Sequence, residues 1–272
     1  MRRFGSLVLS LIVSLAATAQ TPSTTPPAAP PSTTPAVPAN SATLAEPGAP
    51  RTTVPSDSNE RARPKNYQDC RDRVAAAKGH PVDILFVGDS ITEAWSGPAW
   101  GGYEHGAAVW ATRYAPRNAL NFGVGADKTE NVLYRLDTMG VHVLSPKVTV
   151  LMIGTNNTQD TPPDIAAGVR AVLDKLEALY PSTRVILVSI LPNARATQLM
   201  ADTNDIIRTF ADDRTVFFLD LAAKMPPTGD NWQGLSADKL HPNRSGYQIW
   251  ADAMEPLLTR LLASGPAPAA TP

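Results

Sequence analysis

Four short segments of this chain carry glycine or polar residues at or after the ends of predicted strands. They are Gly88-Asp89-Ser90, Asn121-Phe122-Gly123, Gly154-Thr155-Asn156 and Asp238-Lys239-Leu240-His241. Together they hold what acyl transfer needs: a nucleophilic hydroxyl, a base, a carboxylate that orients the base, and donors for an oxyanion. A serine or glycine after a strand is by itself more often a helix cap or a turn. The inference therefore rests on the four segments occurring together.

The residue types suggest one division of roles. Ser90 is the candidate nucleophile and His241 the candidate base. Asp238 lies three residues before His241, so one tight turn puts both side chains on the same side, where the carboxylate can fix the imidazole tautomer. Gly123 allows a backbone N–H to come close because it has no side chain, and Asn156 offers a side-chain amide. With the N–H of Ser90, these two residues form the predicted oxyanion hole.

Alternating strand and helix patterns must position these residues. Strands are predicted at 83–87, 119–122, 147–153, 184–191 and 216–220, and helices at 67–78, 129–139, 197–212 and 245–262, with one more beginning at 162. The stretch 93–114 is expected to be irregular with short helical pieces. This alternation is typical of a parallel sheet of about five strands with helices on both faces. Ligands bind at the carboxyl edge of such sheets, where the four segments would meet.

Competing motifs fail on particular residues. Thr92 occupies the last position of a would-be G-x-S-x-G, which argues against an α/β-hydrolase elbow. The run 123–129 resembles a phosphate-binding loop, but no glycine precedes Lys128. Lys128 also stands where the dinucleotide fingerprint needs its third glycine.

Composition excludes several further classes. Residues 65–263 carry 19 basic and 22 acidic side chains, a net charge of −3, which argues against nucleic acid as a partner. Cys70 is the single cysteine, so an intrachain disulfide and a thiolate metal cluster are excluded, and we expect a buried bystander thiol. Among the other histidines, His80 and His142 are expected at the surface, whereas His105 could line a pocket. No metal and no cofactor is predicted.

The N-terminal residues predict export. A basic start, an apolar run over 7–17 and Ala17-Thr18-Ala19 form a signal peptide over residues 1–19, cleaved near Ala19. The expected location is therefore secreted or periplasmic, without stable membrane insertion after cleavage. Residues 20–64 are rich in Pro, Thr and Ser and predict a disordered linker before a domain at 65–263. The tail 264–272 is expected to be disordered as well.

The domain resembles the SGNH (GDSL-type) hydrolases over nearly its whole length. The residues that name that family fall on Ser90, Gly123, Asn156 and His241. Within the family, the branch of the platelet-activating factor acetylhydrolase catalytic subunits is most similar, and the stretches that carry this likeness are 84–92, 119–137, 146–157 and 190–192. The resemblance implies a flavodoxin-like three-layer α/β/α fold and a metal-independent serine esterase.

The expected function combines the resemblance with the signal peptide. It is a secreted esterase that releases short acyl groups, acetyl first, from a small-molecule or polysaccharide ester. Two alternatives stay open: a glycan O-acyltransferase and an inactive carbohydrate-binding module. Four tryptophans outside a core pattern either face the substrate or pack under loops; they are Trp95, Trp100, Trp110 and Trp232. The sequence leaves the alcohol half of the ester and the oligomeric state open.

Overall fold

The computed structural model of the chain describes residues 48–97 and 105–265. The predicted signal peptide, the predicted linker up to residue 47, Trp100 and the tail beyond residue 265 lie outside these ranges.

Five parallel strands form the central sheet, as the sequence predicts. They are β1 (Ile84–Gly88), β2 (Ala119–Gly123), β3 (Val148–Met152), β4 (Arg184–Val188) and β5 (Val216–Leu219), in the order β2-β1-β3-β4-β5. The strand order reverses beside β1, and such a switch point is where open α/β sheets form a crevice for ligands. Gly88, at the end of β1, is in register with Gly123 and Met152 on the neighbouring strands. Ser90 therefore follows the strand that adjoins this crevice.

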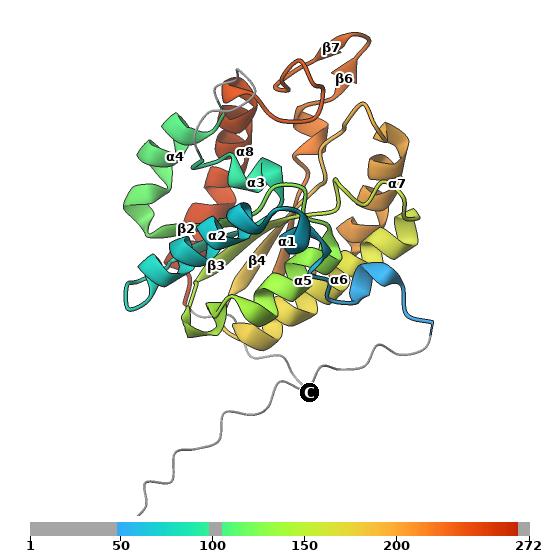
Figure 1. Ribbon diagram of the computed structural model, residues 1–272. Helices are drawn as coiled ribbons and strands as arrows, with labels where there is room; N and C mark the ends of the chain where they lie inside the picture. Colours follow the sequence, from blue (N-terminus) through green and yellow to red (C-terminus); the bar gives the residue numbers. More distant parts are fainter. Residues whose placement is uncertain (1–47, 98–104, 266–272) are drawn as a thin grey trace, which may run out of the picture. The chain divides into compact units, whose positions relative to one another are not determined.

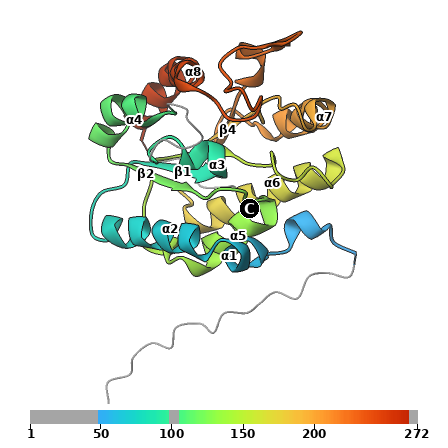
Figure 2. The same cartoon turned by 45° about the horizontal axis from the view of Figure 1, so that its top comes forward.

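Eight helices surround the sheet within the described part of the chain. They are α1 (Ser58–Ala62), α2 (Pro64–Ala77), α3 (Ser90–Glu93), α4 (Ala107–Arg113), α5 (Thr129–Thr138), α6 (Pro162–Leu179), α7 (Thr197–Ile207) and α8 (Arg244–Ala263). Figures 1 and 2 show α4 and α8 on one side of the sheet and α2, α5 and α6 on the other. None of the helices in the described ranges is both long and apolar enough to cross a membrane.

Side chains alternate between the two faces of the buried strands, as the pleat of a strand requires. In β1, Ile84 and Phe86 pack into the core under α4 and α8, whereas Leu85 and Val87 join the core under α2, α5 and α6. Both faces are therefore buried, which explains why the predicted strands are continuous apolar runs rather than alternating ones.

The described aromatic residues of the 93–114 stretch, Trp95, Trp110 and Tyr114, belong to the core. Trp95 is fully buried and Trp110 nearly so, and Trp95 makes ring contacts with Phe86, Tyr114 and Tyr247. Packing is thus the role of these two tryptophans. Cys70 is fully buried as expected, and burial raises the pKa of its thiol.

The predicted boundary between linker and domain is wrong. The ordered part begins before residue 65, with a 3₁₀ turn η1 (Arg51–Thr53) followed by α1. Thr52 is fully buried, and its Oγ1 donates to the carbonyl oxygen of Asp164 at 2.6 Å. A Pro- and Thr-rich composition suggested disorder here, but individual polar side chains attach this segment to α5 and α6.

Two other features escape the sequence patterns. A two-stranded antiparallel pair, β6 (Pro227–Thr228) and β7 (Asn231–Trp232), precedes the His241 segment. The predicted strand over 184–191 ends at Val188, because the chain beyond it leaves the sheet. Ser189 remains buried there, and its Oγ accepts from the N–H of Ala222.

Candidate active site

Ser90, His241 and Asp238 form a continuous hydrogen-bonded chain. Ser90 Oγ lies 2.9 Å from His241 Nε2, and His241 Nδ1 lies 2.7 Å from Asp238 Oδ2. A carboxylate can only accept, so Nδ1 carries the proton and Nε2 keeps its lone pair for the serine hydroxyl. This is the tautomer that a general base for Ser90 requires.

A tight turn holds Asp238 in place beneath His241. Asp238 Oδ1 accepts from the backbone N–H groups of Leu240 and His241, each at 3.0 Å. Lys239 adopts a left-handed conformation, with φ of 53°, to close the turn. The i, i+3 spacing therefore acts as the sequence predicts, with one carboxylate oxygen on the backbone and the other on the imidazole.

The serine is presented by a short helix that α8 supports. Asp89 caps α3, and its Oδ1 accepts from Ile91 N–H at 2.9 Å. Tyr247, on α8, donates from its hydroxyl to the carbonyl oxygen of Ile91 at 2.6 Å. Since α8 begins three residues after His241, this contact links the element that follows the base to the element that carries the nucleophile.

Burial shapes the acid–base behaviour of the triad. Burial lowers the pKa of His241 below 6.5, although Asp238 acts in the opposite direction. For Asp238, burial raises the pKa, but the hydrogen bonds from His241 and Leu240 outweigh it and hold the pKa below 3.8. At neutral pH the imidazole is therefore neutral and the carboxylate charged, as a general base and its orienter must be.

Asn156 lies at the cleft with its amide held at both ends. Asn156 Nδ2 donates to the carbonyl oxygen of Asp127 at 2.9 Å, and its Oδ1 accepts from Arg195 Nη2 at 3.3 Å. The nitrogen end has a second hydrogen, which this geometry leaves for a substrate.

Gly123 does not offer its N–H to the cleft, and its predicted role is corrected. That N–H donates to Asn121 Oδ1 at 2.9 Å. A Cβ at this position would lie 2.3 Å from the backbone nitrogen of Glu93, so the glycine is required for the close approach of β2 and α3. Its role is packing beneath the nucleophile helix.

Ala126 is a candidate for the backbone N–H that Gly123 does not offer. Gly125 and Ala126 line the cleft beside Ser90, and Ala126 has a left-handed φ of 66°. The N–H of Gly125 donates to Glu93 Oε2, whereas that of Ala126 has no partner among the described residues. The sequence pattern points to Gly123 because glycine has no side chain. It does not point to Ala126, which lies three residues later in the same loop.

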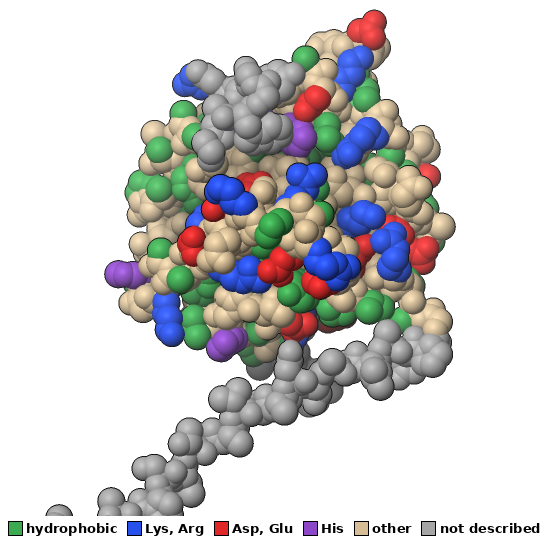
Figure 3. Space-filling model, viewed as in Figure 1, with side chains coloured by type: hydrophobic (Ala, Val, Ile, Leu, Met, Phe, Trp, Pro, Cys, Tyr) green, Lys and Arg blue, Asp and Glu red, His purple; other side chains and the backbone are tan. Residues whose placement is uncertain are grey.

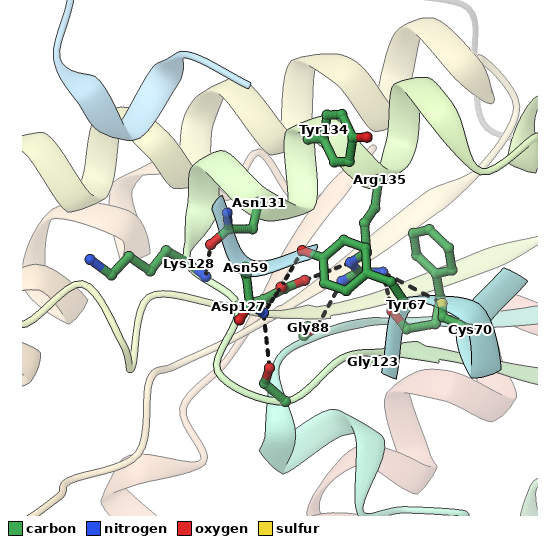
Figure 4. Close-up of polar contacts among 12 residues, drawn as sticks. Asn59, Tyr67, Cys70, Gly88, Gly123, Asp127, Lys128, Asn131, Tyr134 and Arg135 are labelled. Carbon is green, nitrogen blue, oxygen red and sulfur yellow. Dashed lines mark hydrogen bonds and ion pairs between the residues drawn. The ribbon is translucent and has the colours of Figure 1, made fainter. Parts of the chain in front are cut away.

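A buried polar network fixes the loop that carries Ala126 (Figure 4). Asp127 and Arg135 form a salt bridge in which both side chains are fully buried, and the carboxylate raises the pKa of Arg135 although burial opposes this. Arg135 also donates to the carbonyl oxygens of Phe122 and Gly88, at the carboxyl ends of β2 and β1. One guanidinium thus ties two strand ends to the loop.

Two further side chains complete this network. Tyr67 Oη donates to Asp127 Oδ1 at 2.7 Å, and Asn59 Nδ2 lies within hydrogen-bond distance of both Asp127 Oδ1 and the carbonyl oxygen of Gly125. With all its polar groups satisfied, a buried network of this kind specifies one conformation.

The site opens into a cleft of about 580 Å³. Its lining includes Ser90, Asn156 and His241, and of the other described lining residues only Ala126 and Leu240 have apolar side chains. His105 is buried behind the base, with Nδ1 3.2 Å from the carbonyl oxygen of Pro242, whereas His80 and His142 are exposed as predicted. Nowhere in the described ranges do three His, Cys, Asp or Glu side chains gather as a metal site would require.

Known proteins are similar to this chain in sequence. The α1 subunit of platelet-activating factor acetylhydrolase IB from Rattus norvegicus is 30% identical over 196 residues, which cover 70% of this chain and 81% of that protein. The α2 subunit from the same organism is 32% identical over 136 residues, which are 50% of this chain and 52% of that protein.

Solved structures agree with the fold. A Streptococcus pneumonia protein described as a platelet activating factor superposes with a TM-score of 0.59 at 20% identity, covering 74% of this chain and 97% of its own. Axe2, an acetylxylan esterase from Geobacillus stearothermophilus, gives a TM-score of 0.50 at 19% identity, with 69% and 96% covered. Residues 86–249, which run from β1 into α8 and include all three triad residues, match the GDSL-like lipase/acylhydrolase family, and the chain belongs to that family.

Proposed function

We propose that the chain is a serine esterase that removes short acyl groups, acetyl first, from O-acylated carbohydrate outside the cytoplasm. The observation that carries the proposal is the hydrogen-bonded chain from Ser90 through His241 to Asp238. A carbohydrate-binding module would need none of these contacts.

The chemistry follows from the positions of these atoms. Ser90 Oγ attacks the ester carbonyl while His241 Nε2 takes its proton, and the imidazolium then protonates the leaving alcohol. The acyl group stays on Ser90 until water, deprotonated by His241, attacks the acyl carbonyl and releases the acid. The N–H groups of Ser90 and Ala126 and the amide of Asn156 stabilise the oxyanion in both steps.

The cleft supports a short acyl group and water as acceptor. Only Ala126 and Leu240 among its described lining residues have apolar side chains, which supports a short rather than a long acyl group. The side chains of His241 and Asp238 are 12% and 34% exposed. Water that reaches the base favours hydrolysis over transfer to a glycan. The likeness to an acetylxylan esterase fold and the predicted signal peptide support an extracytoplasmic acetylated carbohydrate.

Two substitutions test the mechanism. Ser90→Ala and His241→Ala should each abolish hydrolysis of p-nitrophenyl acetate, with a loss of about 10⁴-fold or more in kcat, while circular dichroism and melting temperature stay unchanged. His142→Ala, at an exposed histidine away from the cleft, is the matched control and should keep full activity. Residual activity of Ser90→Ala near that of the control would show that Ser90 is not the nucleophile.

The substrate class needs its own experiment. Acetate release should be measured from acetylated xylan, acetylated peptidoglycan and simple sugar acetates, beside p-nitrophenyl esters of increasing chain length. We expect kcat/KM to fall steadily beyond the acetyl and propionyl esters. A preference for long acyl chains would contradict the proposal.

A further inference from the structure

The cleft around Ser90 is lined by more basic than acidic side chains. The lining basic residues are Arg63, Lys65, Arg73 and Arg195, and the lining acidic residues are Asp69 and Glu93. The whole chain has a formal charge of −1, so overall composition does not explain the excess. The face seen in Figure 3 carries several Lys and Arg side chains near its centre.

The two acidic side chains offset only part of this excess, the charges of Lys65 and Arg73, and leave those of Arg63 and Arg195. Asp69 pairs with Lys65, one turn away on α2, with Nζ 2.7 Å from Oδ2. Glu93 accepts from the N–H of Gly125, and burial raises the pKa of its carboxyl group. One acid is thus already paired, and the other is buried and bound to the backbone.

None of the three lining arginines, Arg63, Arg73 and Arg195, forms a salt bridge within the described residues, although the charge of Arg73 opposes the burial that raises the pKa of Glu93. Arg73 is occupied by the carbonyl oxygens of Asn121 and Gly123. Arg195 makes a single long hydrogen bond to Asn156, and Arg63 and Arg195 are both exposed. These two guanidinium groups therefore face the cleft with their charge available.

Resting on the proposed function, we propose that the preferred ester carries a negative charge on its alcohol half, as a carboxylate or a phosphate, which Arg63 and Arg195 bind. The planar fork of a guanidinium matches both anions. The acyl half is too small to reach past the oxyanion hole, so the charge belongs to the alcohol. Arg195 beside Asn156 would hold that group as the ester carbonyl enters the oxyanion hole.

Matched aryl acetates test the charge preference. The probes are the acetate esters of para-hydroxyphenylpropionate, of its neutral N-methylamide, and of tyrosol phosphate, whose phenol leaving groups are closely similar. We expect kcat/KM for the better anion to exceed that for the amide by about tenfold at low ionic strength, and the ratio to approach one as salt screens the charges. The better anion distinguishes carboxylate from phosphate. Equal values for all three esters would overturn the inference.

Variants assign the preference to the two arginines. Arg63→Gln combined with Arg195→Gln should remove most of the anion-to-amide ratio. Arg61→Gln is the matched control, because Arg61 is an exposed arginine of α1 that pairs with Asp57 and does not line the cleft. A ratio that falls equally in the control would show that the preference arises from general surface charge and would overturn the assignment.

A binding measurement on an inactive variant tests the charge preference independently of the esterase proposal. Ser90→Ala protein should bind the intact anionic ester about tenfold more tightly than the amide in a calorimetric titration. If no ester is hydrolysed by the wild type but this difference is found, the esterase proposal fails and the charge preference stands. If the esters are hydrolysed and the two bind equally, the charge preference fails and the esterase proposal stands.

Discussion

His241 must be neutral before it can take the proton of Ser90, so its pKa sets the acid limit of activity. Burial lowers that pKa below 6.5. We therefore expect kcat/KM for p-nitrophenyl acetate to be constant above about pH 7 and to fall with unit slope through a pKa below 6.5. A pH–rate profile checks this, and an acid limb centred above 6.5 would contradict it.

Asp89 offers a control for this profile. Burial raises the pKa of its carboxyl group to about 7, so it also titrates near neutrality. Asp89→Asn keeps an acceptor for the N–H of Ile91 and removes the titration. The acid limb should remain in this variant if it belongs to His241, whereas a limb caused by Asp89 would disappear.

We expect Asn156 to contribute through the transition state rather than through substrate binding. Asn156→Ala removes one oxyanion donor and should lower kcat by about 10²–10³-fold with little change in KM. The neighbouring Asn157 is a matched control, because its amide bonds to Thr129, Glu130 and Asp160 rather than facing the cleft. Asn157→Ala should lower the melting temperature instead. Similar kcat values for the two variants would show that Asn156 does not stabilise the oxyanion.

At the scale of single residues, the sequence predicts which side chains reach the site better than it predicts which backbone N–H groups do. The positions of Ser90, Asp238, His241 and Asn156 follow from residue types at strand ends, and the structure brings them together. The N–H of Gly123 points elsewhere because Asn121, two residues before, accepts it. The direction of a backbone N–H depends on local dihedrals and on such neighbours, which a residue type does not reveal.

A substitution on α2 tests whether the buried network positions the loop that carries Ala126, here called the oxyanion loop. Tyr67→Phe removes the hydroxyl that donates to Asp127 and should loosen the loop that carries Ala126, lowering kcat about tenfold and stability by about 1 kcal/mol. Tyr180→Phe is the matched control, because its buried hydroxyl donates to the carbonyl oxygen of Val141 away from the site. It should lose similar stability without losing kcat. Equal kcat for both variants would show that the network stabilises the fold but does not position the loop.

Element prediction succeeds where one periodic pattern decides the structure. α5 and α6 carry apolar faces at helical spacing, and each begins at the residue predicted. α1 has five residues, and β6 and β7 have two residues each, so none of them shows such a pattern. The position of α1 depends on contacts with distant segments, such as that of Asn59 with the Gly125 carbonyl, so local sequence does not show it. Within the described residues, β6 and β7 pair only with each other, across the two-residue turn Gly229-Asp230.

At the scale of the whole molecule, residues 48–64 belong to the domain, although their composition resembles a linker. Ser56 N–H donates to the carbonyl oxygen of Glu130, and Asn131 Nδ2 donates to that of Ser56. Arg51 pairs with Glu130, whose side chain is only 2% exposed. Removal of this segment would take the ion-pair partner from a buried carboxylate and leave it, among the described residues, with hydrogen bonds from Thr129 and Asn157 alone, which is costly.

Two shortened chains test this conclusion. A chain that begins at residue 48 should keep the melting temperature and kcat of the longer one, because every contact described here lies within it. A chain that begins at residue 65 should melt about 5–15 °C lower, since it loses several hydrogen bonds, the ion pairs of Arg51 with Glu130 and Asp160, and the ion pair of Glu60 with Arg71. It should also lose kcat, because Asn59 no longer holds the carbonyl oxygen of Gly125 beside Ala126. Thermal melts and p-nitrophenyl acetate kinetics measure both effects.

Asn59→Ala in the chain that begins at residue 48 separates the two effects of that deletion. This substitution keeps Arg51 and its two ion pairs but removes the contacts with Asp127 and Gly125. It should reproduce most of the loss in kcat and only a small part of the loss in melting temperature. Unchanged kcat in Asn59→Ala, with kcat lost on deletion, would show that the segment acts through global stability alone. The expected split would show that residues before the predicted domain boundary help to position the oxyanion loop.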